Sequence, residues 1–205
     1  MLELICQLHI VYIIILLYDI DEVRCMNNDK FLEILNQVEN RSDIASSQIP
    51  SLDLYIDQIM TLFDVELNDN KRYEDDKVLT KTMINNYSKA GILKPIKGKK
   101  YSKEHILQML LIYSLKNTIS IQEIKKVLQP YHQSDESIEP IYEEFITVKN
   151  ELSHNITEQL QSFINSKNID LNDPKQLTVT LLLICAISNQ FQTIAQSMLD
   201  TYYNE

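Results

Sequence analysis

Glycine is nearly absent from this sequence, with two in 205 residues, and tryptophan is absent altogether. Nucleotide-binding loops need glycine where the backbone approaches phosphate, and hairpin-rich all-β folds need it in tight turns. The sequence also holds no GxGxxG, P-loop or G-x-S-x-G motif. These absences argue against the common nucleotide-binding and hydrolase folds, and they favour an all-α, mainly helical protein.

Cysteine and histidine are too few and too scattered to suggest a site. The three cysteines form no C-x-x-C pair and the four histidines no H-x-x-x-H pair. A disulfide framework or a structural zinc site is therefore not expected, and a reducing, cytoplasmic location fits the cysteine usage. No acid–base pair, nucleophile or metal set can be assembled from the sequence. We expect no catalytic residues, no metal and no cofactor, and hence no enzyme.

The N-terminal 25 residues differ from the rest of the chain. Residues 4–18 carry no charge and include the run IVYIIILLY. The uncharged stretch as a whole is shorter than the ~20 residues needed to span a bilayer. Residues 22–24 can be encoded by GAG-GTG-AGG, which reads like a ribosome-binding site ahead of Met26. We expect translation to start at Met26, with residues 1–25 a spurious upstream extension. The alternative is a genuine strand or core helix.

From Met26 onward the apolar residues recur mostly at helical spacing. Thr80, Ser102 and Ser120 are suited to cap helices, and Gly91 to end one in the left-handed conformation. Pro130 is expected to follow the end of a helix, and Asp173-Pro174 to start one. Helices are therefore expected over residues 28–40, 51–67, 80–91, 103–117, 120–129, 137–166 and 174–202. The corresponding organisation is a short helix and linker (26–49), a central domain (50–129) and a helical C-terminal domain for core packing or dimerisation (130–205).

Acidic residues are missing from one stretch of an otherwise acidic chain. The formal net charge is −10, yet residues 77–103 contain eight lysines and no Asp or Glu. A local basic surface attracts phosphate over a Debye length of about 8–10 Å even on an acidic protein. The plainer interpretation is a solvated lysine-rich face, and the position of the lysines argues against it.

The lysines fall on an expected helix and on the turn that follows it. The apolar residues of 80–91 leave a polar, acid-free face on which Asn can read adenine and Lys can contact phosphate. The segment KPIKGKKY (94–101) resembles a short basic wing. A polar helix beside a basic turn is typical of a winged helix-turn-helix. The candidate DNA-binding residues are Lys81, Thr82, Asn85, Asn86, Lys89, Lys94, Lys97, Lys99 and Lys100.

The same stretch resembles the N-terminal DNA-binding region of MerR-type regulators. Their pattern T-I-R-Y-Y-x-x-x-G-L-L, followed by Pro and a basic wing ending in Tyr, is matched at Ile84, Tyr87, Gly91, Ile92, Leu93, Pro95 and Tyr101. SIQEI (120–124) is similar to the S-L-x-E-I that opens that family's next helix. Asn85-Asn86 replace the family's Arg-Tyr, and the wing carries lysines in place of arginines. Base readout would therefore differ, and phosphate would be bound by point charges.

A closer resemblance covers residues 49–129. The motifs IPSLDLYIDQ, LTKTMINNYSKAGI, KKYSKEHI and SIQEIK resemble an uncharacterised bacterial family, domain of unknown function 1836. Together the two resemblances imply a MerR-like winged helix-turn-helix followed by a helical C-terminal domain. The function they imply is that of a cytoplasmic transcriptional regulator bound to double-stranded DNA as a homodimer. The alternative is a helical protein–protein interaction module that keeps the winged-helix fold without binding DNA.

The last expected helix is unusual because residues 176–199 contain no charged side chain. Polar residues such as Asn189 and Gln192 interrupt it, so a membrane span is not expected. A helix that is apolar nearly all round is normally buried. We expect it to be the central helix of the domain or, alternatively, half of a dimer interface.

Overall fold

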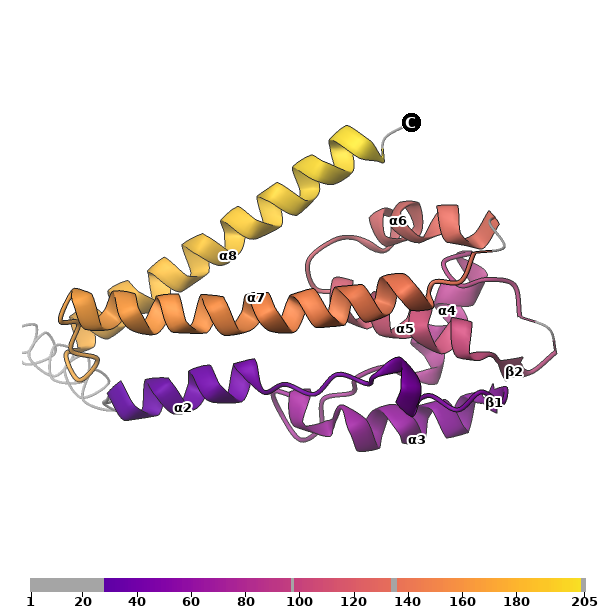
Figure 1. Ribbon diagram of the computed structural model, residues 1–205, viewed down its shortest axis with the longest axis horizontal. Helices are drawn as coiled ribbons and strands as arrows, with labels where there is room; N and C mark the ends of the chain where they lie inside the picture. Colours follow the sequence, from indigo (N-terminus) through magenta and orange to yellow (C-terminus); the bar gives the residue numbers. More distant parts are fainter. Residues whose placement is uncertain (1–27, 97, 134–135, 204–205) are drawn as a thin grey trace, which may run out of the picture.

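The protein is mainly helical, as expected. The computed structural model describes residues 28–96, 98–133 and 136–203. Within these ranges the α-helices are joined by two short 3-10 turns and one pair of two-residue antiparallel strands (Figure 1). In chain order the elements are α2 (Asn28–Glu39), η1 (Ser46–Gln48), β1 (Leu54–Tyr55), α3 (Ile56–Glu66), η2 (Asn68–Asn70), α4 (Lys81–Lys89), β2 (Lys100–Tyr101), α5 (Lys103–Leu115), α6 (Ile121–Gln133), α7 (Glu139–Ser166) and α8 (Pro174–Tyr202). The expected extension, residues 1–25, lies outside the described residues.

Several helix ends form as the sequence predicts. The hydroxyl of Thr80 accepts the backbone N–H of Met83 at 3.1 Å, which satisfies one free donor at the start of α4. Gly91 has φ +67° after the last turn of α4, the left-handed conformation in which glycine costs least. The carboxylate of Asp173 accepts the N–H of Lys175 at 3.1 Å and caps α8 ahead of Pro174.

Two boundary predictions are wrong. The helix expected from Ser51 begins at Ile56, because Leu54 and Tyr55 are drawn into an antiparallel pair with Tyr101 and Lys100. The segment expected to form a wing hairpin is therefore tied to the strand that precedes α3. Pro130 does not end α6, which continues through it to Gln133. Proline removes one donor, yet tertiary packing can hold a helix beyond it.

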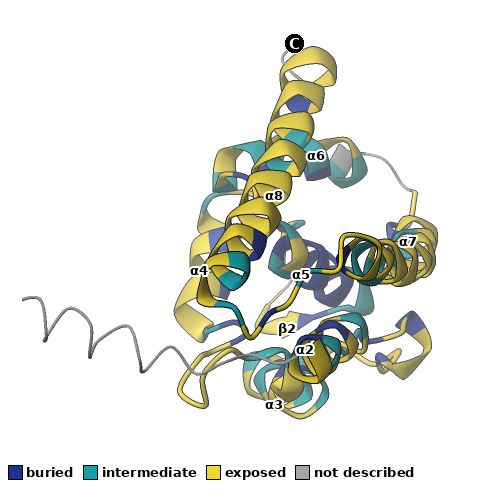
Figure 2. Ribbon diagram, turned by 90° about the vertical axis from the view of Figure 1, so that its left-hand side faces the viewer, coloured by how far each residue is buried: buried dark blue, intermediate teal, exposed yellow. Residues whose placement is uncertain are grey.

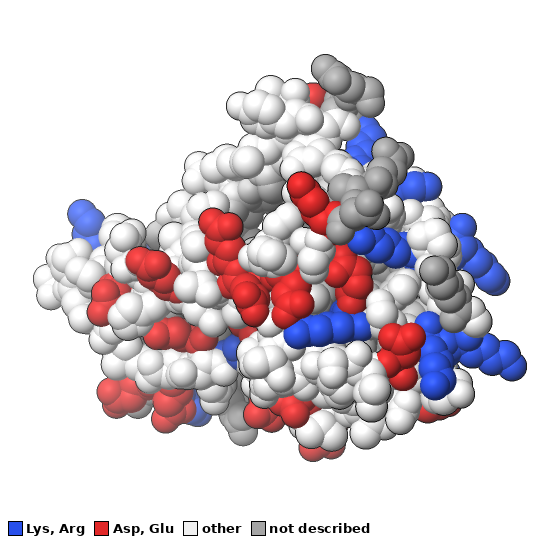
Figure 3. Space-filling model, turned by 45° about the vertical axis from the view of Figure 1, so that its right-hand side comes forward, with Lys and Arg blue, Asp and Glu red and all other residues white. Residues whose placement is uncertain are grey.

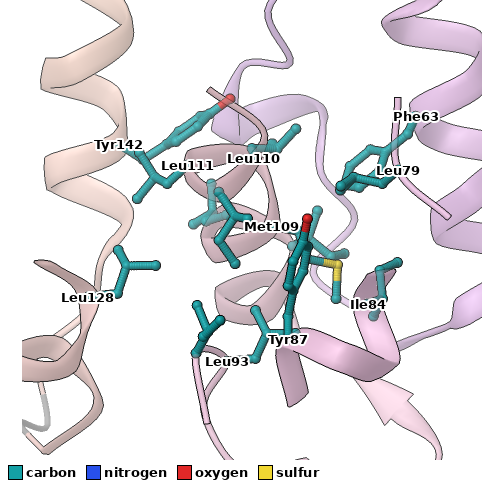
Figure 4. Close-up of a cluster of buried hydrophobic side chains, with 14 of the residues drawn as sticks. Phe63, Leu79, Ile84, Tyr87, Leu93, Met109, Leu110, Leu111, Leu128 and Tyr142 are labelled. Carbon is teal, nitrogen blue, oxygen red and sulfur yellow. The ribbon is translucent and has the colours of Figure 1, made fainter. Parts of the chain in front are cut away.

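The main hydrophobic core is built around α5. Eight consecutive residues of this helix, His105–Ile112, are buried, so α5 is covered on all sides. Figure 4 shows side chains from α3, α4, α6 and α7 converging on it, with Tyr87 beside Met109 and Tyr142 beside Leu111. The hydroxyl of Tyr142 donates to the carbonyl of Ile44 at 2.7 Å, which joins α7 to the segment that follows α2. The central helix of the fold is thus α5 and not α8.

A second, smaller core lies at the far end of α7. Phe31 and Leu35 of α2 pack there against Ile164 and Leu171. Polar contacts between α2 or its following loop and α7 continue toward the main core, through the His154–Glu39 and Lys149–Asp43 pairs. Helices α2 and α7 therefore lie side by side along much of their length (Figure 1).

Helix α8 is mostly exposed. It starts near the end of α7 and runs diagonally away from that helix, toward the side that carries α6 (Figure 1). Figure 2 shows it almost entirely in the exposed colour. Only 6% of its most apolar 18-residue window is buried, so the expectation of a buried core helix is wrong. By length and composition it is the one helix among the described residues that could cross a membrane.

Candidate nucleic-acid interface

Helix α4 presents a polar stripe that contains no acidic residue. Ile84 and Tyr87 fix the opposite side of the helix in the main core. Thr82, Asn85, Asn86 and Lys89 follow the i, i+3, i+4, i+7 spacing of one helix face, and all four are exposed. We call these four residues the α4 stripe.

The chemistry of the α4 stripe suits a surface rich in phosphate and base edges. An Asn amide can pair with adenine through two hydrogen bonds in the major groove, and Lys and Thr can contact phosphate or guanine. The ammonium group of Lys89 is not held by an acidic side chain among the described residues. The structure thus places four of the predicted residues on one exposed face of α4, namely Thr82, Asn85, Asn86 and Lys89.

The basic turn after α4 returns to the sheet through Lys99 and Lys100, both exposed. Gly98 has φ +76° with open space around it, which allows the chain to reverse there. The ammonium of Lys100 lies 5.1 Å from the centre of the Tyr55 ring, so a cation–π contact orients it without neutralising its charge. Lys97 lies outside the described residues.

Three other lysines of the acid-free stretch form ion pairs with acids from elsewhere in the chain. Lys81 pairs with Asp57 of α3, and Lys103 pairs with Glu139 of α7 at 2.7 Å. Lys94 is half-buried, with its Nζ atom 3.1 Å from an oxygen of Glu104. Lys81 and Lys94 were expected to contact DNA, and these pairings reduce the charge that they offer to a ligand.

Glu104 connects the start of the basic turn to the residues that precede α7. Besides Lys94, it accepts the hydroxyl of Ser137 at 3.1 Å and the backbone N–H of Ile138 at 3.0 Å. The backbone N–H of Lys94 donates to the side-chain oxygen of Gln108 at 3.0 Å. The start of the turn is therefore held by α5 and by the entry to α7.

Two histidines flank this connection with lowered pKa values. Burial lowers the pKa of His105, and the carbonyls of Lys94 and Pro95 partly oppose that effect. His105 Nδ1 accepts the backbone N–H of Ser102 at 3.1 Å, so the neutral ring caps α5 and carries its proton on Nε2. Burial, with Lys94 as the next cause, also lowers the pKa of His132. The lowered pKa values favour the neutral form of both rings, which does not add positive charge to the interface.

Lys125 belongs with the interface and was not predicted. It lies on α6, and its Nζ atom is 3.4 Å from the position that a Cβ on Gly91 would occupy. The Lys125-Lys126 doublet was visible in the sequence, but it lies outside the acid-free stretch. Lys125 joins the interface because α6 packs beside the end of α4. Figure 3 shows Lys and Arg side chains gathering toward the end of the molecule that carries α4 and the strand pair.

The described part of the chain has no group of three or more His, Cys, Asp or Glu side chains placed to hold a metal ion. The interface is thus a surface of amides, hydroxyls and ammonium groups. Such a surface can bind phosphate and base edges.

Comparison with known proteins identifies the central part of the chain. Residues 44–145 match the family described as "Domain of unknown function (DUF1836)". The match begins at Ile44 and ends just beyond Tyr142, the two residues whose hydrogen bond closes the main core. No curated protein and no solved structure matches the chain.

Proposed function

We propose that the DUF1836 domain formed by residues 44–145 binds double-stranded DNA as a MerR-like winged helix-turn-helix, and that the protein is a transcriptional regulator. In this proposal α3 and α4 are the two helices of the motif, and α4 enters the major groove. The observation that carries the proposal is the α4 stripe, an exposed helix face of amide, hydroxyl and ammonium groups without an acid.

The surrounding lysines support this orientation. Lys99 and Lys100 lie on the turn, and Lys125 lies at the end of α4. Among the described residues, none of the three forms an ion pair with an acidic side chain. Their ammonium groups are available to the backbone phosphates on either side of the groove, and these contacts would set position and affinity rather than sequence.

Most of the acidic side chains of the chain lie outside α4, and many of them are on α7. Glu74, Asp75 and Asp76 of the loop after α3 nevertheless line the same pocket as Lys81 and Thr82, so negative charge also lies beside the start of α4. Charges more than about 8–10 Å from a phosphate are largely screened at physiological ionic strength. The acidic surface would then orient DNA toward the basic end. A DNA partner implies a cytoplasmic location.

The protein–protein interaction module remains the second candidate, and one observation favours it. The ion pairs of Lys81 and Lys94 lower the positive potential around the α4 stripe. A weaker basic surface suits an acidic protein segment, which has a lower charge density than duplex DNA.

Salt-dependent binding separates the two candidates. Fluorescence anisotropy of the full chain with labelled duplex DNA should show log K falling steeply with log salt, by about 0.9 per phosphate contact. The variant Lys99→Gln/Lys100→Gln should lower that slope by roughly two. The control Lys167→Gln, an exposed lysine at the far end of α7, should leave the slope unchanged. Absence of binding at low salt would reject the regulator and favour the interaction module.

A further inference from the structure

Helix α7 carries an apolar face that the described part of the chain leaves largely uncovered. At 100° per residue, its four large apolar side chains fall within about 80° of one another. They are 41–54% exposed, and Figure 2 shows most of α7 in the exposed colour. We call this set the α7 face: Val148, Leu152, Ile156 and Phe163. Exposed apolar surface that is rimmed by polar residues marks a place where another molecule binds.

The contacts of α7 with α2 and with the segment after it use the neighbouring side of the helix. Tyr142 donates a hydrogen bond to Ile44, Lys149 pairs with Asp43, and Ile164 packs in the second core. These three α7 residues lie within about 60° of one another, and their centre is roughly 80° around the helix from that of the α7 face. The α7 face therefore borders the α2 contact and stays outside it.

Glutamates at seven-residue intervals border the other edge of the α7 face. Glu144, Glu151 and Glu158 all have exposed side chains. Glu158 has an oxygen 3.4 Å from Nε2 of the exposed His154. In the part of the chain that the structure describes, Glu144 and Glu151 form no ion pair. The α7 face is thus an apolar strip with negative charge along one side.

We propose that the α7 face binds an amphipathic helix of a different protein, one that carries Lys or Arg along the flank that meets the glutamates. Such a helix lays apolar side chains, spaced three and four residues apart, onto a complementary apolar surface. Charged residues beside the seam between two helices select the partner and its orientation. Glutamates spaced by seven residues match basic residues at the same spacing. The proposal concerns α7 alone and does not depend on DNA binding.

Charge disfavours a second copy of this chain as the occupant. A second α7 would present the same three glutamates, and its single lysine, Lys149, is already held by Asp43. Helix α8 of a second copy offers no counter-charge either, because residues 176–199 contain no charged side chain. A basic helix of another protein supplies the positive charge that this chain lacks there.

The same glutamates disfavour nucleic acid and anionic lipid. Duplex DNA and the surface of an anionic bilayer are both negatively charged, so each would be repelled along this edge of α7. The α7 face and the basic surface around α4 therefore suit ligands of opposite charge.

A synthetic peptide tests the proposal. The probe is a labelled peptide about three heptads long, with Leu at positions a and d and Lys at positions e and g, and its control carries Glu at e and g. Fluorescence anisotropy with the full chain should show binding of the Lys peptide that weakens as salt is added. The Glu peptide should bind at least about tenfold more weakly.

Matched charge variants show whether the glutamates of α7 are responsible. Glu144→Gln/Glu151→Gln should weaken binding of the Lys peptide roughly 2- to 30-fold, since each exposed ion pair contributes modestly. The control Glu33→Gln/Glu74→Gln removes the same charge from exposed positions on α2 and in the loop after α3, and should leave binding unchanged.

A matched apolar pair tests the α7 face itself. Leu152→Ser should weaken binding of the Lys peptide about tenfold, because it removes apolar area that the peptide would cover. The control Leu52→Ser changes an exposed leucine ahead of β1 and should leave binding unchanged. Circular dichroism of each variant reports whether the helices persist.

Three results would overturn the proposal. One is equal binding of the Lys and Glu peptides, or equal losses in the α7 variants and their controls. Another is light scattering in which Leu152→Ser converts a dimeric full chain into a monomer, because a second copy would then occupy the α7 face. The third is co-sedimentation of the full chain with phosphatidylcholine vesicles that Leu152→Ser abolishes, which would assign the face to lipid.

Discussion

The Nζ atom of Lys125 lies 3.4 Å from the point at which a Cβ atom on Gly91 would stand. The end of α4 favours glycine because the backbone there has φ +67°. A Cβ atom would meet the flexible end of the Lys125 side chain at ordinary contact distance, so the backbone conformation alone sets the preference.

Replacement of Gly91 should therefore cost stability. Gly91→Ala places a Cβ in the left-handed conformation and should lower the free energy of unfolding by about 1–2 kcal/mol. Gly91→Asn should cost less, because Asn tolerates this conformation better than Ala. Urea unfolding followed by circular dichroism measures both. Equal stability of Gly91→Ala and the unmodified chain would show that the turn relaxes freely.

The hydrogen bond between Tyr142 and Ile44 should contribute to the stability of the whole domain. Tyr142→Phe keeps the ring in the core but leaves the buried carbonyl of Ile44 without this donor. We expect a loss of about 1–3 kcal/mol in the free energy of unfolding. Tyr202→Phe, at an exposed position on α8, is the control and should change little. A loss of the same size in both variants would contradict the assignment.

Stability should fall as the pH drops below the ordinary histidine pKa of 6.5. The pKa of His105 is lowered by burial, so the unfolded chain takes up a proton at a higher pH than the folded chain does. The contribution of His105 is therefore present above pH 6.5 and is lost as the pH falls toward its lower folded pKa. His105→Gln keeps a capping side chain for Ser102 but does not titrate, so its urea midpoint should decline less between pH 7.5 and 5.5. An unchanged decline would assign the effect to other groups.

His154 should act in the opposite direction. Its pKa is raised, chiefly by the hydrogen bond to Glu39, so it stabilises the α2–α7 contact below pH 6.5. That contribution is lost as the pH rises through its folded pKa. In His154→Gln, acidification should no longer strengthen the contact, and hydrogen exchange of α2 amides at pH 5.5 and 7.5 reports it directly. If the α2 amides of the unmodified chain are equally protected at pH 5.5 and 7.5, the His154–Glu39 pair does not stabilise the α2–α7 contact.

Asn86 should affect sequence preference if α4 enters the major groove. Asn86→Ala removes an amide that can pair with adenine, and should reduce discrimination at one base pair by about 1–3 kcal/mol, or roughly 5- to 150-fold. Competition between a selected duplex and a single-substitution series measures this loss. Binding to random duplex DNA should be unchanged, and an equal loss on random DNA would remove Asn86 from base readout.

Local features of the fold were predictable because they depend on neighbouring residues. The cap at Thr80, the left-handed Gly91 and the start at Asp173-Pro174 need only a few residues of sequence, and all three form. The strand pair was missed because Leu54 meets Tyr101 only after the chain has folded back. Pro130 within α6 was missed for a related reason, since surrounding packing outweighs its local preference.

The candidate interface was predictable to the same extent. Helical periodicity identified the exposed side of α4, because Ile84 and Tyr87 mark the buried side. Periodicity does not reveal that Glu104 reaches Lys94, or that α6 brings Lys125 to Gly91. Composition showed that α8 is apolar, but whether its own chain covers it is a property of the tertiary structure.

The side-by-side placement of α2 and α7 also fixes an order of events during synthesis. Glu39 meets a partner 115 residues later in the chain, and Ile44 one that is 98 residues later. At about 5–20 residues per second, α2 is synthesised roughly 5–20 seconds before the residues that cover it. Throughout that interval the apolar side of α2 has no native partner. The rate of translation therefore sets how long a nascent chain of this protein is exposed to chaperones and to other nascent chains.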